Sequence, residues 1–545
     1  MHAKQTPKIN MTGILNKQER VEIRKRIFLH LDGWALIPSI YALHKLDILS
    51  HFLEKNKWSL HDLNKITKTN EGYLNVALRI LASQGYLLRK IDNIHDSIHL
   101  ELTTIGIQAI ELVTHYKTFY NLIQSYSIRP KNLMSDAANM DLLEEAWNEL
   151  KCFKNHSNNL LRTRMAFHME GILLGPIMVG LGINNKFENL NENYILSSKK
   201  LGINKRTFNW IIDIFEHLNF ISTTNSEKRF NNKGIFYAKR ASAYGVTVSY
   251  LPTFAQLETL LIGNPNKLWE KTADGDESHV YRYMNVWGSG GAHSTYFKKI
   301  DEIIIEIFNR PINEQPKGII DVGCGDGTFI HHVYTIISEK TARGKILYKH
   351  PLLIVGADYN KKARVATRNK MNAENITAEI VFGDISDPEN LNKMLFEKHG
   401  IRLGDLLNTR TFLDHNRIYQ KPSKTELTTK SEGAFAYRGR RIPNNELFQN
   451  LNNHLKSWAP FLKKFGLLIV ELHSIKSKDT ASNIGKSLAT PYDATHGYTD
   501  QYIIEHSCFI NAAKHAGLAP IEKHSFKFPD NQTTTVSIQL LKTIE

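Results

Sequence analysis

The sequence predicts an α/β protein: a seven-stranded, doubly wound (Rossmann-like) sheet preceded by a mainly α-helical half that contains two winged-helix-like repeats. Three observations support this fold. Apolar strand-like segments alternate with helical segments over residues 313–545, the first of these strands ends in a glycine-rich turn, and the N-terminal half repeats one order of elements. At 545 residues, the chain is long enough for three or four domains.

The glycine-rich turn follows the first predicted strand, residues 319–322. Glycine occupies positions 323, 325 and 327, and an amphipathic helical segment follows. Glycine permits backbone angles that other residues avoid, and it lets a ligand approach the main chain at a helix N-terminus. A dinucleotide fingerprint would need glycine at position 328, where the chain has Thr328. The turn therefore predicts a nucleotide-binding site for a different ligand.

Each of the first three predicted strands ends in an aspartate: Asp321, Asp358 and Asp384. A single aspartate at a strand end usually caps a turn or a helix. Three in register behind successive strands predict one binding edge instead. The interval from Asp321 to Asp358 is longer than a minimal strand–helix–strand unit requires, and the excess falls in residues 341–351. We interpret these residues as an inserted loop.

The segment D-V-G-C-G-D-G at residues 321–327 resembles motif I of class I S-adenosylmethionine (SAM) dependent methyltransferases. The resemblance implies SAM as the cofactor, with Asp321 near its methionine end, Asp358 on the ribose hydroxyls and Asp384 at the adenine amino group. The cofactor-binding residues predicted on this basis are Asp321, Gly323, Cys324, Gly325, Gly327, Asp358, Tyr359, Asp384 and Ile385.

A divergent repeat organises the N-terminal half. Residues 30–38 align with residues 168–176 at a constant offset of 138, and each copy continues with helices and a β wing, the winged-helix order. Winged helices often bind DNA. Here, however, the presumed recognition helices, residues 73–81 and 207–215, are apolar round much of their surface, which predicts that they are buried. The helical segments predicted after the repeat are residues 59–66, 70–84, 193–201 and 205–217.

These modules resemble the often dimer-forming N-terminal domains of small-molecule O-methyltransferases. The resemblance implies a homodimer as one expectation and no nucleic-acid partner. The predicted domains are module 1 over residues 1–140, module 2 over residues 141–255, a connector or lid over residues 256–312, and a SAM-dependent catalytic domain over residues 313–545.

The connector contains glycine, serine and aromatic residues between positions 280 and 293 and then leads into a helix over residues 296–308. It is either an ordinary loop or a segment that folds over the cofactor and presents His293. Further along, the remaining strands are predicted at residues 405–413, 466–472, 521–526 and 533–541, with a long loop over residues 491–501.

The motifs at residues 285–290, 321–327, 411–417 and 495–497 resemble those of C-methyltransferase domains of polyketide synthases, particularly in loading modules. The resemblance covers residues 280–545. It implies methylation of the acidic α-carbon of an acyl group held on a carrier protein, with a single metal ion in some members. No carrier or ketosynthase module accompanies the domain here, so the acceptor would be a free small molecule or a separate acyl carrier protein.

Candidate catalytic groups lie after strands four and five, at the edge where ligands of such sheets collect. A carbon acceptor needs a base or a Lewis-acidic metal, and an oxygen acceptor needs only a base. The candidate bases are His415 and His293. Nitrogen and oxygen ligands for one divalent metal ion are available from Asp414, His415, His496 and Gln501.

Three functions remain open from the sequence: methylation of a carrier-bound or free β-dicarbonyl acyl carbon, small-molecule O-methylation, and SAM-responsive DNA binding. The net charge of +15 is diffuse, which favours a solvated surface over a nucleic-acid site. Three scattered cysteines suit a reducing cytoplasm. No secretory signal is recognisable, and the longest apolar stretch, residues 171–183, contains glycine and proline, so no membrane span is expected.

Overall fold

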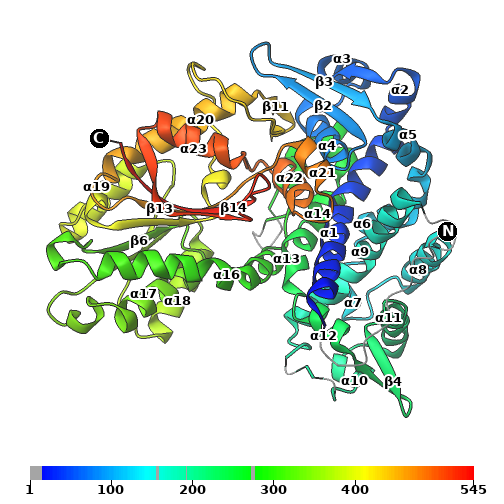
Figure 1. Ribbon diagram of the computed structural model, residues 1–545, viewed down its shortest axis with the longest axis horizontal. Helices are drawn as coiled ribbons and strands as arrows, with labels where there is room; N and C mark the ends of the chain where they lie inside the picture. The colour runs from blue at the N-terminus through cyan, green and yellow to red at the C-terminus, as the bar shows by residue number, and fades with distance from the viewer. Residues whose placement is uncertain (1–14, 155–158, 189, 192, 272–276, 545) are drawn as a thin grey trace.

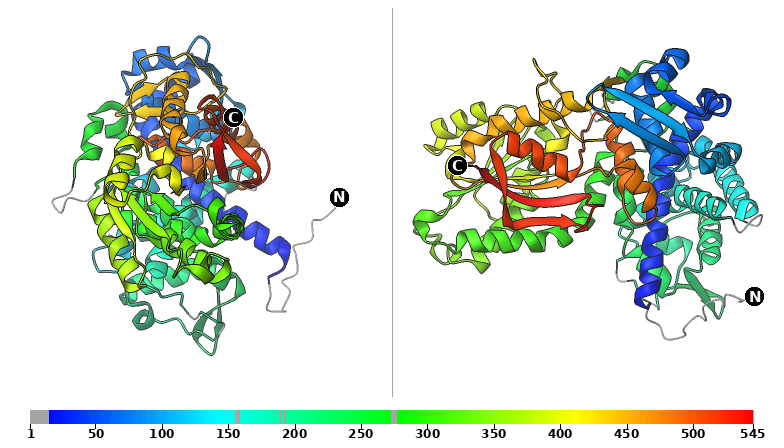
Figure 2. Two further views of the ribbon diagram at one scale, coloured as in Figure 1. Left: turned by 90° about the vertical axis from the view of Figure 1, so that its left-hand side faces the viewer. Right: turned by 45° about the horizontal axis from the view of Figure 1, so that its top comes forward.

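The structure is a computed structural model that describes residues 15–154, 159–188, 190–191, 193–271 and 277–544, without the side chains of residues 291–295. It has two parts that lie side by side (Figure 1). The helical N-terminal half is on the right of that view, and the sheet of the C-terminal half is on the left. The tilted view on the right of Figure 2 shows the same division.

The first module starts with a long helix whose N-terminus is fixed by a capping box between Asn16 and Glu19. A winged-helix arrangement follows, in which strand β1 pairs with β3 and β3 with β2. The elements of this module are α1 (Lys17–Lys45), α2 (Ile48–Glu54), β1 (Lys57–Ser59), α3 (Leu60–Thr67), α4 (Glu71–Ser83), β2 (Leu87–Asp92), β3 (Ser97–Leu102), α5 (Thr104–Glu111), α6 (Lys117–Ser125) and α7 (Pro130–Leu133). Helix α8 (Met140–Lys154) begins at the predicted boundary with module 2.

The second module repeats this order with a shorter wing. The segment predicted as a helix over residues 193–201 forms only the short helix α10, so that prediction was too long. The elements are α9 (Leu160–Ile183), α10 (Ser198–Leu201), α11 (Lys205–His217), β4 (Ile221–Thr224), β5 (Glu227–Phe230), α12 (Asn232–Ala238), α13 (Ser242–Ser249), α14 (Leu251–Phe254) and α15 (Leu257–Ile262).

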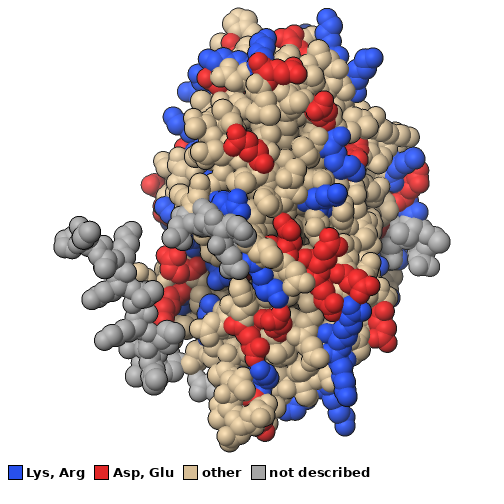
Figure 3. Space-filling view, turned by 90° about the vertical axis from the view of Figure 1, so that its right-hand side faces the viewer, with Lys and Arg blue, Asp and Glu red and all other residues tan. Residues whose placement is uncertain are grey.

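Helix α9 is long and apolar enough to cross a membrane by length and composition, but 83% of its most apolar window is buried inside the protein. It packs along α1 as a core helix, so its apolar surface is buried by other helices of the same chain. On the face of the N-terminal half that Figure 3 shows, acidic and basic side chains are interspersed.

The C-terminal half is a seven-stranded sheet with the strand order β13-β14-β12-β9-β6-β7-β8, which confirms the predicted fold class. Strand β14 runs antiparallel to both its neighbours, and the other pairs are parallel. The strands are β6 (Gly318–Val322), β7 (Leu353–Asp358), β8 (Glu379–Phe382), β9 (Leu407–Thr411), β12 (Leu467–Leu472), β13 (Leu518–Phe528) and β14 (Val536–Thr543).

Helices cover both faces of the sheet (Figure 1). Successive residues of β6 point to opposite faces, so Ile319 joins one apolar core and Ile320 the other. The covering helices are α16 (Arg282–Phe308), α17 (Thr328–Lys340) and α18 (Lys361–Ala373) on one face, and α19 (Pro388–His399), α20 (Asn444–Trp458) and α23 (His506–His515) on the other.

Two predicted irregular segments are helical, so both predictions were wrong. Within the connector, residues 282–293 are the first part of one continuous helix, α16, which also contains the predicted helix over residues 296–308. Glycine allows close helix packing there: a methyl group at Gly288 would lie 2.5 Å from the backbone nitrogen of Val246. The predicted loop over residues 491–501 contains α22 (Ala489–Gly497), which is buried against the N-terminal half. Among the elements of the C-terminal half without a sequence prediction are α21 (Ser477–Ser482) and the hairpin of β10 (Phe435–Tyr437) and β11 (Arg440–Ile442).

Candidate functional site

The glycine turn lies between β6 and α17. Gly323, Gly325 and Gly327 have φ values of 82°, 56° and 80°, in the left-handed region that favours glycine. A methyl group at Gly323 would come within 2.7 Å of the Cδ2 atom of Leu413, so the segment after β9 packs directly on this turn. The turn therefore connects the predicted cofactor site to the predicted catalytic segment.

The three predicted carboxylates lie at the carboxyl ends of β6, β7 and β8, which are neighbours in the sheet. Asp358 Oδ2 accepts a hydrogen bond from the backbone nitrogen of Gly325 at 3.1 Å, which ties the second strand to the turn. Asp384 Oδ1 accepts from the backbone nitrogen and the hydroxyl of Ser386, at 2.8 Å and 2.6 Å. The edge thus presents oxygen acceptors in a row.

Asp321 is the most buried of these carboxylates. Its Oδ1 atom accepts from the Thr409 hydroxyl at 3.0 Å, while its Oδ2 atom is buried without a hydrogen-bond partner. Burial raises the pKa of Asp321 to about 8, and the charge of Asp358 adds to this rise. A buried, unpartnered carboxylate oxygen is suited to a cationic or hydrogen-bond-donating ligand group.

The other predicted cofactor residues flank this edge. The Tyr359 side chain is 62% exposed, with its ring centroid 5.4 Å from that of Phe382. Ile385 packs against the core of the sheet. The Cys324 thiol is buried, lies 3.4 Å from the Thr367 hydroxyl and has a pKa raised to about 12 by burial, so it acts as a packing group and not as a nucleophile.

His415 and His496 come together, although 80 residues of sequence separate them. His415 lies in the short 3-10 helix η6 (Asp414–Asn416) directly after β9, and His496 lies in α22. Their ring centroids are 5.0 Å apart in an edge-to-face arrangement. Both side chains are almost completely buried.

Glu471 orients the His415 ring. One carboxylate oxygen lies against His415 Nδ1, and the other accepts from the His415 backbone nitrogen at 3.2 Å. The Asn416 amide nitrogen lies 3.3 Å from His415 Nε2. This network assigns the proton to Nδ1 and makes Nε2 an acceptor, which faces the Asn416 amide; an unprotonated Nε2 is what a general base requires.

His496 is held differently. Its Nδ1 atom donates to the Tyr492 carbonyl oxygen at 2.8 Å, which leaves Nε2 unprotonated. Burial, together with a smaller contribution from the neighbouring His415, lowers the pKa of His496 to about 3. His496 is therefore neutral at physiological pH and can accept a hydrogen bond beside His415.

The other two predicted metal ligands, Gln501 and Asp414, lie in different surroundings. The backbone nitrogen of Gln501 donates to the His496 carbonyl oxygen at 3.0 Å, so Gln501 lies beside the pair, and its side-chain amide donates to the Tyr250 hydroxyl at 2.9 Å. Asp414 is bonded elsewhere: its Oδ1 atom accepts from Arg410 Nη1 at 2.6 Å and His454 Nε2 at 2.9 Å. Among the described side chains, no group of three His, Cys, Asp or Glu residues is arranged to hold a metal ion.

The structure does not describe the side chain of one predicted base, His293, and the role of Glu471 was not predicted from the sequence. His293 belongs to α16, but its side chain is among those that the structure does not describe. Glu471 was not predicted. The sequence does contain a signal for it, because Glu471 is an ionisable residue inside the otherwise apolar strand β12. Burying an ionisable side chain without a partner is costly.

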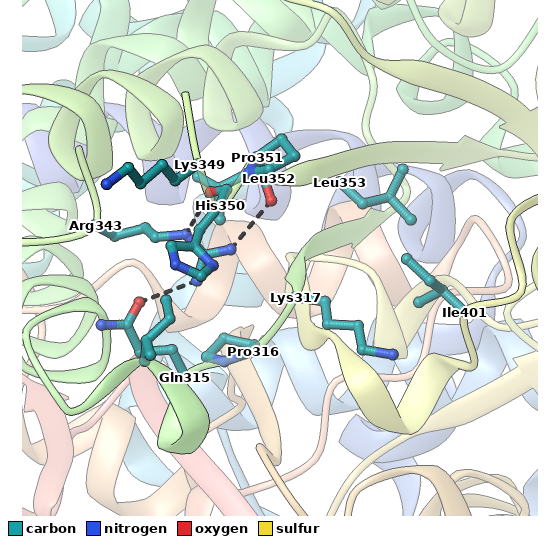
Figure 4. A pocket seen from close by; sticks show the side chains of 11 residues that line it. Gln315, Pro316, Lys317, Arg343, Lys349, His350, Pro351, Leu352, Leu353 and Ile401 are labelled. Carbon is teal, nitrogen blue, oxygen red and sulfur yellow. Dashed lines mark hydrogen bonds between the residues drawn. The ribbon is translucent and has the colours of Figure 1, made fainter. Parts of the chain in front are cut away.

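A cavity of about 490 Å³ lies at the opposite edge of the sheet, next to the amino ends of β6 and β7 (Figure 4). The insertion at residues 341–351 lines it. Arg343 donates from its three nitrogens to Gln315 Oε1 and to the carbonyl oxygens of His350 and Pro351. These hydrogen bonds connect the two ends of the insertion to each other and to Gln315. Lys317 lies 3.6 Å from Asp405. The cavity is thus separate from the cofactor edge.

Residues 277–539 match the family model of the AprA MT2-like domain. This is the region that contains the glycine turn, the three carboxylates and the His415–Glu471 pair. The chain is a SAM-dependent methyltransferase, and its C-terminal half has the class I methyltransferase fold. The methyltransferase also matches the models of the AprA N-terminal domain over residues 23–89 and of the AprA winged helix domain over residues 170–264. Resemblance to AprA domains therefore extends through both halves.

Solved structures similar to the methyltransferase share little sequence with it. The mitomycin 7-O-methyltransferase MmcR is 10% identical with a TM-score of 0.40, and the match covers 68% of this chain and 92% of that one. A putative O-methyltransferase from Nostoc punctiforme is 10% identical with a TM-score of 0.41, covering 69% and 98%. The complex of LepI with SAM is 10% identical with a TM-score of 0.38, covering 80% and 99%. A search of curated proteins found no match.

Proposed function

We propose that the enzyme methylates an acidic carbon of an acyl or β-dicarbonyl acceptor, either free or attached to an acyl carrier protein. The observation that carries this proposal is the His415–Glu471 pair, which is buried beside the glycine turn through the contact of Leu413 with Gly323. An acidic carbon needs a base that removes its proton close to the methyl donor.

We assign the cofactor site to the edge formed by the glycine turn and the three aspartates. Asp358 would bind the ribose hydroxyls, Asp384 the adenine amino group, and Asp321 the positively charged methionine end. The unpartnered Oδ2 atom of Asp321 supports the last assignment because it needs a donor. When bound, SAM supplies a methyl group on an activated sulfonium.

His415 would act as the base. Nε2 accepts the proton from the acceptor carbon, and the resulting imidazolium is stabilised by the Glu471 carboxylate at Nδ1. The carbon–hydrogen bonding electrons then form the new carbon–methyl bond, and the electrons of the broken sulfur–methyl bond remain on sulfur. His496, which stays neutral, would accept a hydrogen bond from the acceptor's enol or hydroxyl group.

The residues present do not form the predicted four-ligand metal site. The two imidazoles lie together, but the Gln501 side-chain amide donates to Tyr250, and Asp414 is bonded to Arg410 and His454. We therefore derive the chemistry from the base alone.

Small-molecule O-methylation is a second candidate, since the same histidine–carboxylate pair would deprotonate a hydroxyl group. The reading as a DNA-binding regulator has less support. Helix α4, at the recognition-helix position of module 1, packs against α21, α22, β10 and β11. Sequence-selective DNA binding by the full chain in a gel shift would support the function as a DNA-binding regulator.

Mass spectrometry of candidate acceptors incubated with enzyme and SAM tests the proposal. The panel should contain acyl carrier proteins loaded with β-dicarbonyl acyl groups, the corresponding free acids and small phenols. We expect addition of one methyl group to carbon of the β-dicarbonyl members. Methylation confined to hydroxyl groups would select the second candidate.

His415→Ala and Glu471→Gln test the base, with His332→Ala as the matched control. His332 also pairs with a carboxylate, Asp301, at 2.6 Å, but it belongs to α17. General-base catalysis contributes roughly 100-fold to 10,000-fold, so His415→Ala should lose turnover on this scale. SAM affinity should change little. Full turnover of His415→Ala would reject the base.

A further inference from the structure

Arg79 of module 1 lies in the contact between this module and the catalytic domain. It belongs to α4, and although it is charged, its side chain is almost completely inaccessible to solvent. A buried guanidinium is costly unless its donors are used. Which groups it binds therefore shows what this helix does in the folded protein.

The guanidinium joins three segments of the catalytic domain. Arg79 Nε donates to Asp493 Oδ2 at 2.9 Å, Nη1 to the Glu432 carbonyl oxygen at 2.5 Å and Nη2 to the Ile475 carbonyl oxygen at 2.6 Å. All three acceptors belong to the catalytic domain, and none is close to Arg79 in sequence. A lysine could not make this planar, forked set of hydrogen bonds.

Two of these segments carry residues of the candidate site. Asp493 is three residues, about one helical turn, before His496 in α22. Ile475 is four residues after Glu471, on the segment that leaves β12. One side chain of module 1 thus fixes the helix that carries His496 to the segment that follows Glu471.

Neighbouring contacts hold the same surface of α22. A methyl group at Gly497 would lie 2.9 Å from Val76 of α4, so the two helices approach closely. The Tyr498 hydroxyl is 3.0 Å from the Ser39 hydroxyl of α1. The site is therefore built against module 1 along the length of α22.

We infer that Arg79 is a positioning residue for the catalytic centre, and that the recognition-like helix of module 1 serves as the scaffold on which His496 is held near His415. This inference rests on the proposed role of the two histidines. It assigns to the winged-helix module a part in catalysis that requires no nucleic acid.

The test compares Arg79 with Arg441 in the full chain. Arg441 also joins the two halves, since β11 places it against Glu71 at 3.1 Å and Asp96 at 2.9 Å, but it binds neither α22 nor the segment after β12. Arg79→Lys keeps the cation opposite Asp493, and Arg79→Met removes it. Arg441→Met is the control for loss of an arginine between the halves.

We expect both Arg79 variants to lower kcat by about tenfold or more, because small displacements of reacting groups have effects of this size. KM for the acceptor should rise and the pH profile of kcat should shift, while calorimetric SAM affinity stays within about twofold since Arg79 lies away from the cofactor edge. Arg441→Met should change each quantity by less than about twofold. A merely structural role would lower the amount of folded enzyme without altering KM or the pH profile.

A second measurement separates this inference from the proposed function. The imidazole NMR signals of His415 and His496, assigned with His→Gln variants, should shift in Arg79→Lys and remain unchanged in Arg441→Met. This readout needs no acceptor, so it stands even if no member of the panel is methylated. If the signals and kcat of Arg79→Lys match those of the unmodified enzyme, the inference is wrong.

Discussion

Gly33 of α1 lies against the backbone of His168 in α9, and a methyl group at Gly33 would come within 2.5 Å of the His168 Cα atom. The reverse contact also exists: a methyl group at Gly171 would lie 2.4 Å from the carbonyl oxygen of His30. The two pairs are related by the offset of 138 residues that the sequence repeat shows. The repeated helices therefore pack on each other with local two-fold character, inside one chain.

Gly33→Ala should destabilise the protein, because the helix crossing leaves no space for a methyl group. Overpacking of this kind costs about 1–3 kcal/mol, which exceeds the gain of about 0.5–1 kcal/mol expected for alanine in a helix. Gly290→Ala in α16 is the matched control, since no atom lies within 4 Å of its added methyl group. Denaturant unfolding should show a loss for Gly33→Ala and no loss for the control; equal stabilities would contradict the close crossing.

Asp358→Ala should abolish measurable SAM binding while the fold remains. The aspartate accepts from Gly325 and stands where the ribose is proposed to bind, so its removal takes away a ligand group and loosens the turn. Asp358→Asn keeps the shape and separates these two effects. The control is Asp405→Ala at the opposite edge, next to Lys317. Unchanged calorimetric affinity in Asp358→Ala would reject the assignment.

SAM affinity should rise with pH and level off above about pH 8. The pKa of Asp321 is raised to about 8 mainly by burial, so below that pH its carboxyl is protonated in the free protein. If a cationic group of SAM binds the ionised form, binding must release a proton, and affinity falls by up to tenfold for each unit below the pKa.

Calorimetry in buffers with different ionisation enthalpies measures this proton release. Asp321→Asn has no proton to release at this position, so its affinity should lose the part of the pH dependence that Asp321 contributes. The same linkage predicts that ionising Asp321 destabilises the SAM-free fold: its contribution to stability is present below the unfolded pKa and is lost as pH rises through about 8. A pH dependence identical in Asp321→Asn and the unmodified protein would exclude Asp321 as its source.

Turnover should survive removal of metal ions. The base mechanism uses His415 and Glu471, and Asp414 is bonded to Arg410 and His454. Enzyme stripped with chelator and verified by elemental analysis should keep its kcat, and added divalent metal should not raise it. Loss of activity that divalent metal restores would show that His415 and His496 are metal ligands, and His496→Ala should then prevent the restoration.

The sequence by itself determined the sheet and the edge at which the glycine turn and the three aspartates meet. The β6 turn needs glycine at positive φ, and aspartates directly after parallel strands must meet at one edge, so local pattern and topology were sufficient there. The helical state of residues 282–293 and 491–497 could not be read from their glycines, because it depends on close packing against α13 and the N-terminal half.

Only the tertiary structure decided which polar groups bind one another at the catalytic centre. His415 and Asp414 are adjacent in sequence, yet one side chain binds Glu471 and the other binds Arg410, because consecutive residues of the turn point in different directions. Arg79 reaches the site from more than 300 residues away in sequence. Such pairings follow from the need to satisfy buried charges, and the partners are fixed only when distant segments pack together.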